Sequence, residues 1–127
     1  MQLTNNDIYN IYQQLGVFAN LDVKVSTGFK INKISKILLE EVKEIDVAKM
    51  KIVEAYCEKD EDGKPRIENG NYKILPEFID QATTELNDLF DVQLDVNIPK
   101  IKLSEIEDLK ISMTTLSTLM PIIEEDE

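Results

Sequence analysis

Two pairs of glutamates have the residue type and spacing that could hold a metal ion. Glu40 with Glu44, and Glu54 with Glu58, lie four residues apart in a helical sequence, which is the spacing at which helical bundles hold metals. The chain contains no histidine, however, and lysines lie between these glutamates. A solvated helix face is therefore the favoured interpretation, and we expect no metal site and no cofactor.

The turn after this helical stretch partly resembles a calcium-binding loop. Asp60-Glu61-Asp62-Gly63 begins like an EF-hand loop, but Pro65 stands where that loop requires glycine. We expect a solvated helix end here. Cys57, the only cysteine, closes an apolar stripe, and its expected role is buried packing. Without histidine, no Ser-His or Cys-His nucleophile can be assembled, so we expect that the chain is not an enzyme.

Charge points to a protein partner. The 127 residues contain 25 acidic and 14 basic side chains, a net charge of −11. Thirteen of the acids but only three lysines lie in residues 77–127. Such a surface repels a phosphate backbone, so we expect no direct nucleic-acid binding. The acidic surface either serves solubility alone or docks on a basic protein. The candidate partner-binding residues are the acids around a predicted ribbon: Asp88, Asp91, Asp95, Glu105, Glu107 and Asp108.

Four lysines near the start of the long helical stretch could instead contact phosphates. They lack interleaved aromatic residues beyond Phe29, so intramolecular pairing with the acidic half is favoured. The four are Lys24, Lys30, Lys33 and Lys36.

The elements that position these residues follow from apolar spacing. Residues 29–56 carry apolar side chains at steps of three and four, which predicts one long helix. A second helix is predicted over residues 76–90, with Pro76 at its first position. Asn69-Gly70 between two short alternating arms predicts a hairpin joining the two helices, which should pack antiparallel.

Shorter elements complete the prediction. Thr4 and Asp7 predict a capped helix over residues 5–15, and the long helix is expected to begin near Asp22. Residues 92–98 alternate like a strand and are expected to pair with residues 100–103 as an antiparallel ribbon. Ser104 and Ser112 are predicted helix caps.

These elements give an α+β fold, mainly α. A single domain is expected over residues 1–123, with residues 124–127 as an acidic tail too polar to pack. No run of eighteen apolar residues occurs, so we expect no membrane span and a cytosolic protein.

Several segments together resemble a small family of phage and prophage proteins of unknown function. The resemblance rests on LTNNDIYNIY (residues 3–12), FKINK (29–33), ENGNYKI (68–74), IKLSEIEDL (101–109) and PIIEE (121–125), and it spans nearly the whole chain. It implies a phage origin, with the bacterial host cytoplasm or the virion as the place of action. It implies no catalytic residues.

Two functions stay open on this basis. The leading hypothesis is a non-enzymatic phage accessory protein that binds and inhibits a host protein, such as a nucleic-acid-handling defence system, through its acidic surface. The alternative is a virion or assembly component, such as a tail or head-completion protein or a chaperone, that acts through oligomer contacts. A homo-oligomer is compatible with both hypotheses.

Overall fold

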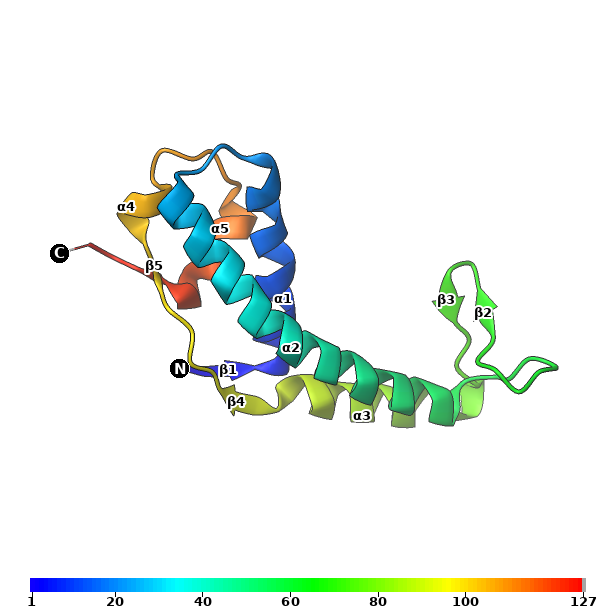
Figure 1. Cartoon of the computed structure of the whole chain (residues 1–127). Coiled ribbons are helices and arrows are strands. Elements are labelled where there is room, and N and C mark those ends of the chain that lie inside the picture. The colour runs from blue at the N-terminus through cyan, green and yellow to red at the C-terminus, as the bar shows by residue number, and fades with distance from the viewer. Residues whose placement is uncertain (127) are drawn as a thin grey trace. The chain divides into compact units, whose positions relative to one another are not determined.

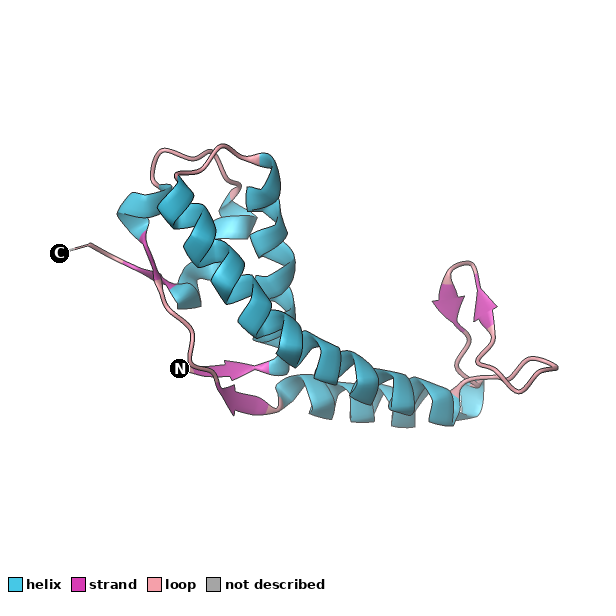
Figure 2. Ribbon diagram, in the orientation of Figure 1, coloured by secondary structure: helices cyan, strands magenta, loops and turns pink. Residues whose placement is uncertain are grey.

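The computed structural model describes residues 1–126, and the chain divides into two compact units. Unit 1 comprises residues 1–42 and 93 onward, and unit 2 comprises Lys43–Val92. Helix α2 (Val25–Tyr56) contributes residues 25–42 to unit 1 and residues 43–56 to unit 2 (Figure 1). Helices dominate both units (Figure 2), and the predicted class, α+β with mainly helices, is confirmed.

Unit 1 begins with strand β1 (Gln2–Thr4) and helix α1 (Asn5–Leu15). The predicted cap of α1 is confirmed, because the Thr4 hydroxyl oxygen accepts from the backbone N–H of Asp7 at 3.0 Å. The Asp7 carboxylate in turn accepts from the Thr4 N–H at 3.1 Å. A 3₁₀ helix, Gly16–Asn20, continues directly from α1.

The predicted start of the long helix near Asp22 is wrong by three residues. Helix α2 begins at Val25, and residues 22–24 have no regular structure. The first helical hydrogen bond at this end runs from the Gly28 N–H to the Lys24 carbonyl at 2.9 Å, so Lys24 rather than Asp22 precedes the helix. At its other end α2 stops at Tyr56, as the apolar stripe predicts.

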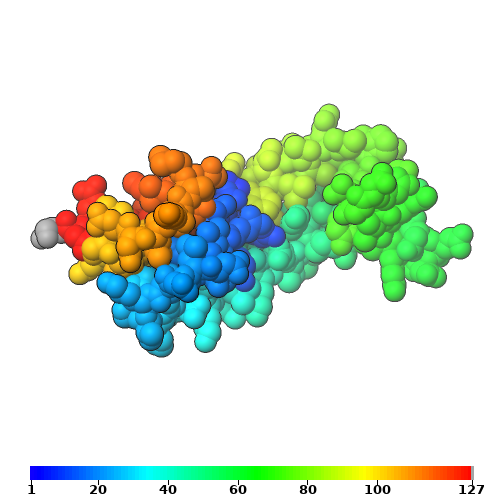
Figure 3. All heavy atoms as spheres, turned by 90° about the horizontal axis from the view of Figure 1, so that it is seen from above, coloured from blue at the N-terminus to red at the C-terminus, as the bar shows by residue number. Residues whose placement is uncertain are grey.

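The core of unit 1 is formed by α1, the first half of α2 and the C-terminal elements. Helix α1 packs against α2 and against α5 (Met113–Leu119), whose atoms lie beside those of α1 in Figure 3. The Ser112 hydroxyl oxygen accepts from the Thr115 N–H at 3.1 Å, which confirms the predicted cap of α5. The fully buried large apolar side chains of this unit are Ile8, Ile11, Ile34, Leu38, Ile101, Leu119 and Ile122.

The predicted antiparallel ribbon does not form. Strand β4 (Gln93–Asp95) pairs antiparallel with β1, so that Leu3 lies opposite Leu94. Strand β5 (Ile101–Lys102) pairs in parallel with β6 (Ile123–Glu124). Residues 96–100 have no regular structure and bury Val96 and Ile98, so they link two separate sheets rather than turning back on themselves.

Two further expectations near the C-terminus are wrong. Ser104 does not cap a helix: α4 (Leu103–Ile106) already contains it, and the Glu105 carboxylate accepts from the Lys102 N–H at 3.1 Å. The expected acidic tail is not free over its first residues. Glu124 lies in β6, and Asp126 accepts from the Ser104 N–H at 2.8 Å and from its hydroxyl. Glu127 lies outside the described residues.

Unit 2 is a pair of antiparallel helices with a hairpin between them. The second half of α2 packs on α3 (Ile79–Asp91), which follows a 3₁₀ turn at Pro76–Phe78. The Tyr56 and Phe78 rings lie 5.4 Å apart between their centroids. Few apolar side chains of this unit are buried: Ile45, Val53, Cys57 and Ala82.

The hairpin is confirmed. Strands β2 (Ile67–Glu68) and β3 (Asn71–Tyr72) pair antiparallel, and Asn69 and Gly70 take φ values of 53° and 81°. Both residues of a type I′ turn require this left-handed geometry, which explains why Asn-Gly occurs here.

We expect Gly70→Ala to loosen this hairpin. Alanine pays about 1 kcal/mol for positive φ, which corresponds to about fivefold faster local opening. Hydrogen exchange of the Lys73 amide, which donates to Arg66 O at 3.0 Å, measures that opening. Gly16→Ala is the control, because Gly16 has φ −61° and its added Cβ meets no atom within 4 Å. Unchanged exchange in Gly70→Ala would contradict the assigned turn.

Candidate functional site

The six predicted partner-binding carboxylates divide between the two units. Asp88 and Asp91 lie on α3 in unit 2, whereas the other four lie in unit 1. The ribbon expected to gather them does not form, so each group is described within its own unit. The four in unit 1 are Asp95, Glu105, Glu107 and Asp108.

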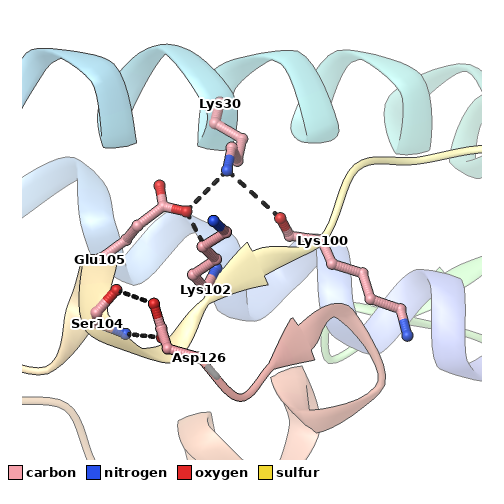
Figure 4. Close-up of polar contacts among 6 residues, drawn as sticks. All are labelled: Lys30, Lys100, Lys102, Ser104, Glu105 and Asp126. Atoms are coloured by element: carbon pink, nitrogen blue, oxygen red, sulfur yellow. Dashed lines mark hydrogen bonds and ion pairs between the residues drawn. The ribbon is translucent and has the colours of Figure 1, made fainter.

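Asp95 and Glu105 already have cationic partners within unit 1. The Asp95 carboxylate accepts from the α-ammonium of Met1 at 2.9 Å and remains 75% exposed. Glu105 accepts from the Lys30 ammonium at 2.7 Å, and only 20% of its side chain is exposed (Figure 4). The Lys30 hydrogen bond is the main reason why the pKa of Glu105 lies below its usual 4.5. Glu105 therefore ties α4 to α2.

Two polar contacts surround this ion pair in Figure 4. The Lys30 ammonium also donates to the Lys100 carbonyl at 3.5 Å. On the other side of α4, hydrogen bonds from Ser104 lower the pKa of Asp126 below its usual value. The expectation that the four helix lysines pair intramolecularly is confirmed for Lys30, whereas over residues 1–126 Lys24, Lys33 and Lys36 form no ion pair.

We expect Glu105→Gln to destabilise the protein at neutral pH by about 1 kcal/mol, because it removes the charge of a half-buried ion pair. The pKa of Glu105 is lowered on folding, so this contribution is present above the unfolded pKa and is lost as pH falls through the folded pKa. Urea unfolding at pH 7 should separate Glu105→Gln from wild type, and the difference should shrink near pH 3. Glu107→Gln is the matched control on an exposed carboxylate. Equal midpoints at pH 7 would contradict the ion pair.

Glu107 and Asp108 are exposed immediately after α4. Within residues 1–126 neither side chain forms an ion pair. Both carboxylates are available for contacts, but Lys110 lies two residues further along the chain and Lys102 lies before α4. The charge around Glu107 and Asp108 is therefore mixed in sign rather than uniformly negative.

The predicted residues Asp88 and Asp91 belong to a longer feature on α3. Four exposed carboxylates follow its outer face and the preceding 3₁₀ turn at helical spacing, and we call them the acidic stripe: Glu77, Asp80, Asp88 and Asp91. Residues 74–99 contain no lysine or arginine. Sequence reasoning missed Glu77 and Asp80, although their three-residue spacing on a predicted helix was the signal that could have found them.

The inward face of α3 is packed rather than available for contacts. Ala82 is buried, and Glu85 is half-buried beside Tyr56. A hydrogen bond between the Tyr56 phenol and the Glu85 carboxylate is the main reason why the pKa of Tyr56 lies above its usual value. Glu85 therefore belongs to the contact between α3 and α2, and the acidic stripe faces away from it.

The position of the stripe opposes the helix dipole. Asp88 and Asp91 lie in the last turn of α3, where no basic residue is present. Carboxylates near a helix C-terminus destabilise the helix, by about 0.3–1 kcal/mol each. These two residues thus reduce the stability of the element that carries them, and their exposed charges suit contacts with another molecule.

A groove lies in unit 1, where α2 meets α1. It has a volume of about 490 Å³, and we call it the α2 groove. Phe29, which lines it, is 72% exposed. A neighbouring hollow of about 460 Å³ shares Tyr12, Asn32 and Ser35 with it. The α2 groove is lined mainly by Tyr12, Phe29, Asn32, Lys33, Lys36 and Leu39.

Three of the residues weighed as metal ligands or nucleophile have structural roles: Glu58, Asp60 and Cys57. Glu58 pairs with Arg66 at 3.1 Å and with Lys73 at 3.3 Å, which ties the hairpin to the end of α2. Asp60 accepts from two backbone N–H groups of its own turn, at 2.9 and 3.0 Å. Cys57 is 3% exposed, so its predicted buried packing is confirmed.

Residues 1–126 contain no group of three or more histidine, cysteine, aspartate or glutamate side chains placed to hold a metal ion. Over the same residues, no helix combines the length and apolar character needed to span a membrane. Comparison of the chain with protein-family models, curated proteins and solved structures found no match.

Proposed function

We propose that this chain is a non-enzymatic phage accessory protein that binds and inhibits a host protein through the acidic stripe of α3. The observation that carries the proposal is the stripe itself: four exposed carboxylates within a segment that has no basic residue. The resemblance to phage and prophage proteins supplies the proposed origin, and the host cytoplasm is the proposed place of action.

The partner proposed is a basic protein whose own ligand is nucleic acid, such as a defence nuclease. Surfaces that bind a phosphate backbone present lysine and arginine side chains. An exposed helix face with carboxylates at successive turns can pair with the same cations. Occupying them would exclude the nucleic acid, which is a physical route to inhibition without any chemical step.

Capture from a phage-infected host lysate tests the proposal. Wild-type protein should retain a basic nucleic-acid-binding protein at low salt and release it at high salt. Asp88→Lys with Asp91→Lys should lose that protein. Glu61→Lys with Asp62→Lys is the matched control, because it makes the same charge change on exposed residues of the same unit. Equal capture by both double variants would overturn the acidic-stripe proposal.

The alternative, a virion or assembly component, is favoured by one observation. Val25 and Phe29, on the first turns of α2, are 90% and 72% exposed, as apolar oligomer contacts would be in a separated chain. Mass spectrometry of purified phage particles distinguishes the two functions. A structural protein is present in stoichiometric copies, whereas an inhibitor of a host protein is not.

A further inference from the structure

The α2 groove combines an apolar lining with a basic rim. Phe29 and Leu39 line it along α2, and Tyr12 lines it from α1. Lys33 and Lys36 also line the groove, and both are exposed. Such a mixture is typical of surfaces that receive an amphipathic helix, since apolar side chains fill the groove and the rim selects charge.

The groove is locally positive in a negatively charged chain. Residues 23–39 contain four lysines and no acid, although the whole chain carries a net charge of −11. Lys30 is paired with Glu105. Over residues 1–126, Lys24, Lys33 and Lys36 form no ion pair. An acidic amphipathic helix would match both this charge and the apolar lining of the groove.

The chain itself carries a helix that fits this description. Asp88 and Asp91 are exposed on α3 and stand three residues apart, as do Lys33 and Lys36 on α2. Val92, directly after Asp91, is 45% exposed and can meet the apolar side chains of the groove. Lysines brought to the last turn of α3 would also complement its dipole, which has no basic residue there.

We propose that α3 of a second copy of this chain docks on the α2 groove. In an antiparallel arrangement of the two helices, Lys33 faces Asp91, Lys36 faces Asp88, and Val92 lies against the groove between Phe29 and Lys33. Self-association then uses the acidic stripe, so it competes with binding of any basic partner. The inference concerns the purified chain alone and does not depend on the host partner.

A charge-swap experiment tests this contact. Sedimentation velocity of the purified full chain at low salt should show concentration-dependent association that weakens at high salt. Lys33→Glu with Lys36→Glu should lower the association constant at least tenfold, and so should Asp88→Lys with Asp91→Lys. Each double variant then opposes like charges across the contact. Mixing the two variants restores opposite charges, so the mixture should associate as wild type does.

Controls separate this contact from a general effect of charge. Lys100→Glu with Lys110→Glu makes the same charge change on exposed lysines outside the groove and should leave association unchanged. Phe29→Ser removes the exposed ring and should weaken association without altering the circular dichroism spectrum. A wild-type chain that stays monomeric at every concentration overturns the proposal, as does a mixture of the two charge variants that fails to associate.

The same variants keep this inference separate from the proposed function. Lys33→Glu with Lys36→Glu leaves the acidic stripe intact, so it should weaken self-association at least tenfold and still capture the basic partner. If this variant associates normally but loses a captured protein, the groove binds another protein, and self-association through it is wrong.

Discussion

Replacing Ile45 with aspartate is expected to unfold unit 2, whereas the same replacement at Val47 leaves it folded. Both residues lie on α2 within unit 2, but Ile45 is 4% exposed and Val47 is 57% exposed. An aspartate at position 45 loses the apolar contacts of isoleucine and buries a carboxylate with no cation to pair with it. The expected cost is about 3–5 kcal/mol.

The measurement is urea unfolding at about neutral pH, monitored by circular dichroism at about 222 nm, where the signal reports helix content. Ile45→Asp should lose its transition or shift it to much lower urea concentration. Unit 2 has few buried side chains to compensate for the loss of Ile45, since the others are Val53, Cys57 and Ala82. If Ile45→Asp and Val47→Asp unfold at the same urea concentration, the assigned inward face of α2 is incorrect.

Elements specified by local sequence could be predicted. The apolar stripe of α2 placed Ile31, Ile34 and Leu38 in the core, where they are at most 4% exposed. Thr4 with Asp7, and Asn69 with Gly70, encode a cap and a turn whose hydrogen bonds or dihedral angles involve neighbours within four residues. The residues that form such a cap or turn are neighbours in the chain, so a single sequence suffices to predict it.

Pairings between distant segments could not be predicted. Strand β1 has three residues, too few for an alternating pattern, yet it supplies the partner of β4. Residues 92–98 and 100–103 both alternate, and their closeness in sequence made a local ribbon the simplest arrangement. Val96 and Ile98 are buried, so the segment between the two strands packs on the core instead of turning back. That core exists only in the folded unit, so the local sequence does not reveal this packing.

The same distinction between local and distant contacts applies to the candidate site residues. Asp88 and Asp91 are exposed, as their place on the outer face of a predicted helix implies. Glu105 looks equally exposed in the sequence, but its partner Lys30 lies 75 residues away. Ion pairs at such separation leave no local pattern, so sequence reasoning could not distinguish a carboxylate that stabilises the fold from one that is available for contacts.

Reversing the charges of Asp88 and Asp91 should change stability and binding in opposite directions. Lysines in the last turn of α3 complement the helix dipole, whereas the native carboxylates oppose it. Asp88→Lys with Asp91→Lys should therefore raise the free energy of unfolding by about 1 kcal/mol. Affinity for a basic partner should fall about hundredfold at low salt, because two attractive charge contacts become repulsive.

Because stability should rise while affinity falls, this double variant is more informative than one that only loses binding. A variant that binds weakly because it is misfolded unfolds at lower urea concentration, whereas this one should unfold at a higher concentration than wild type. The two aspartates would then be residues that lower the stability of α3 and raise its affinity for a cationic surface, a trade-off common at functional sites. If the variant is stabilised and binds as wild type does, the carboxylates serve solubility rather than docking. If it is destabilised, Asp88 and Asp91 make contacts that stabilise α3, and their assignment to a free acidic stripe is wrong.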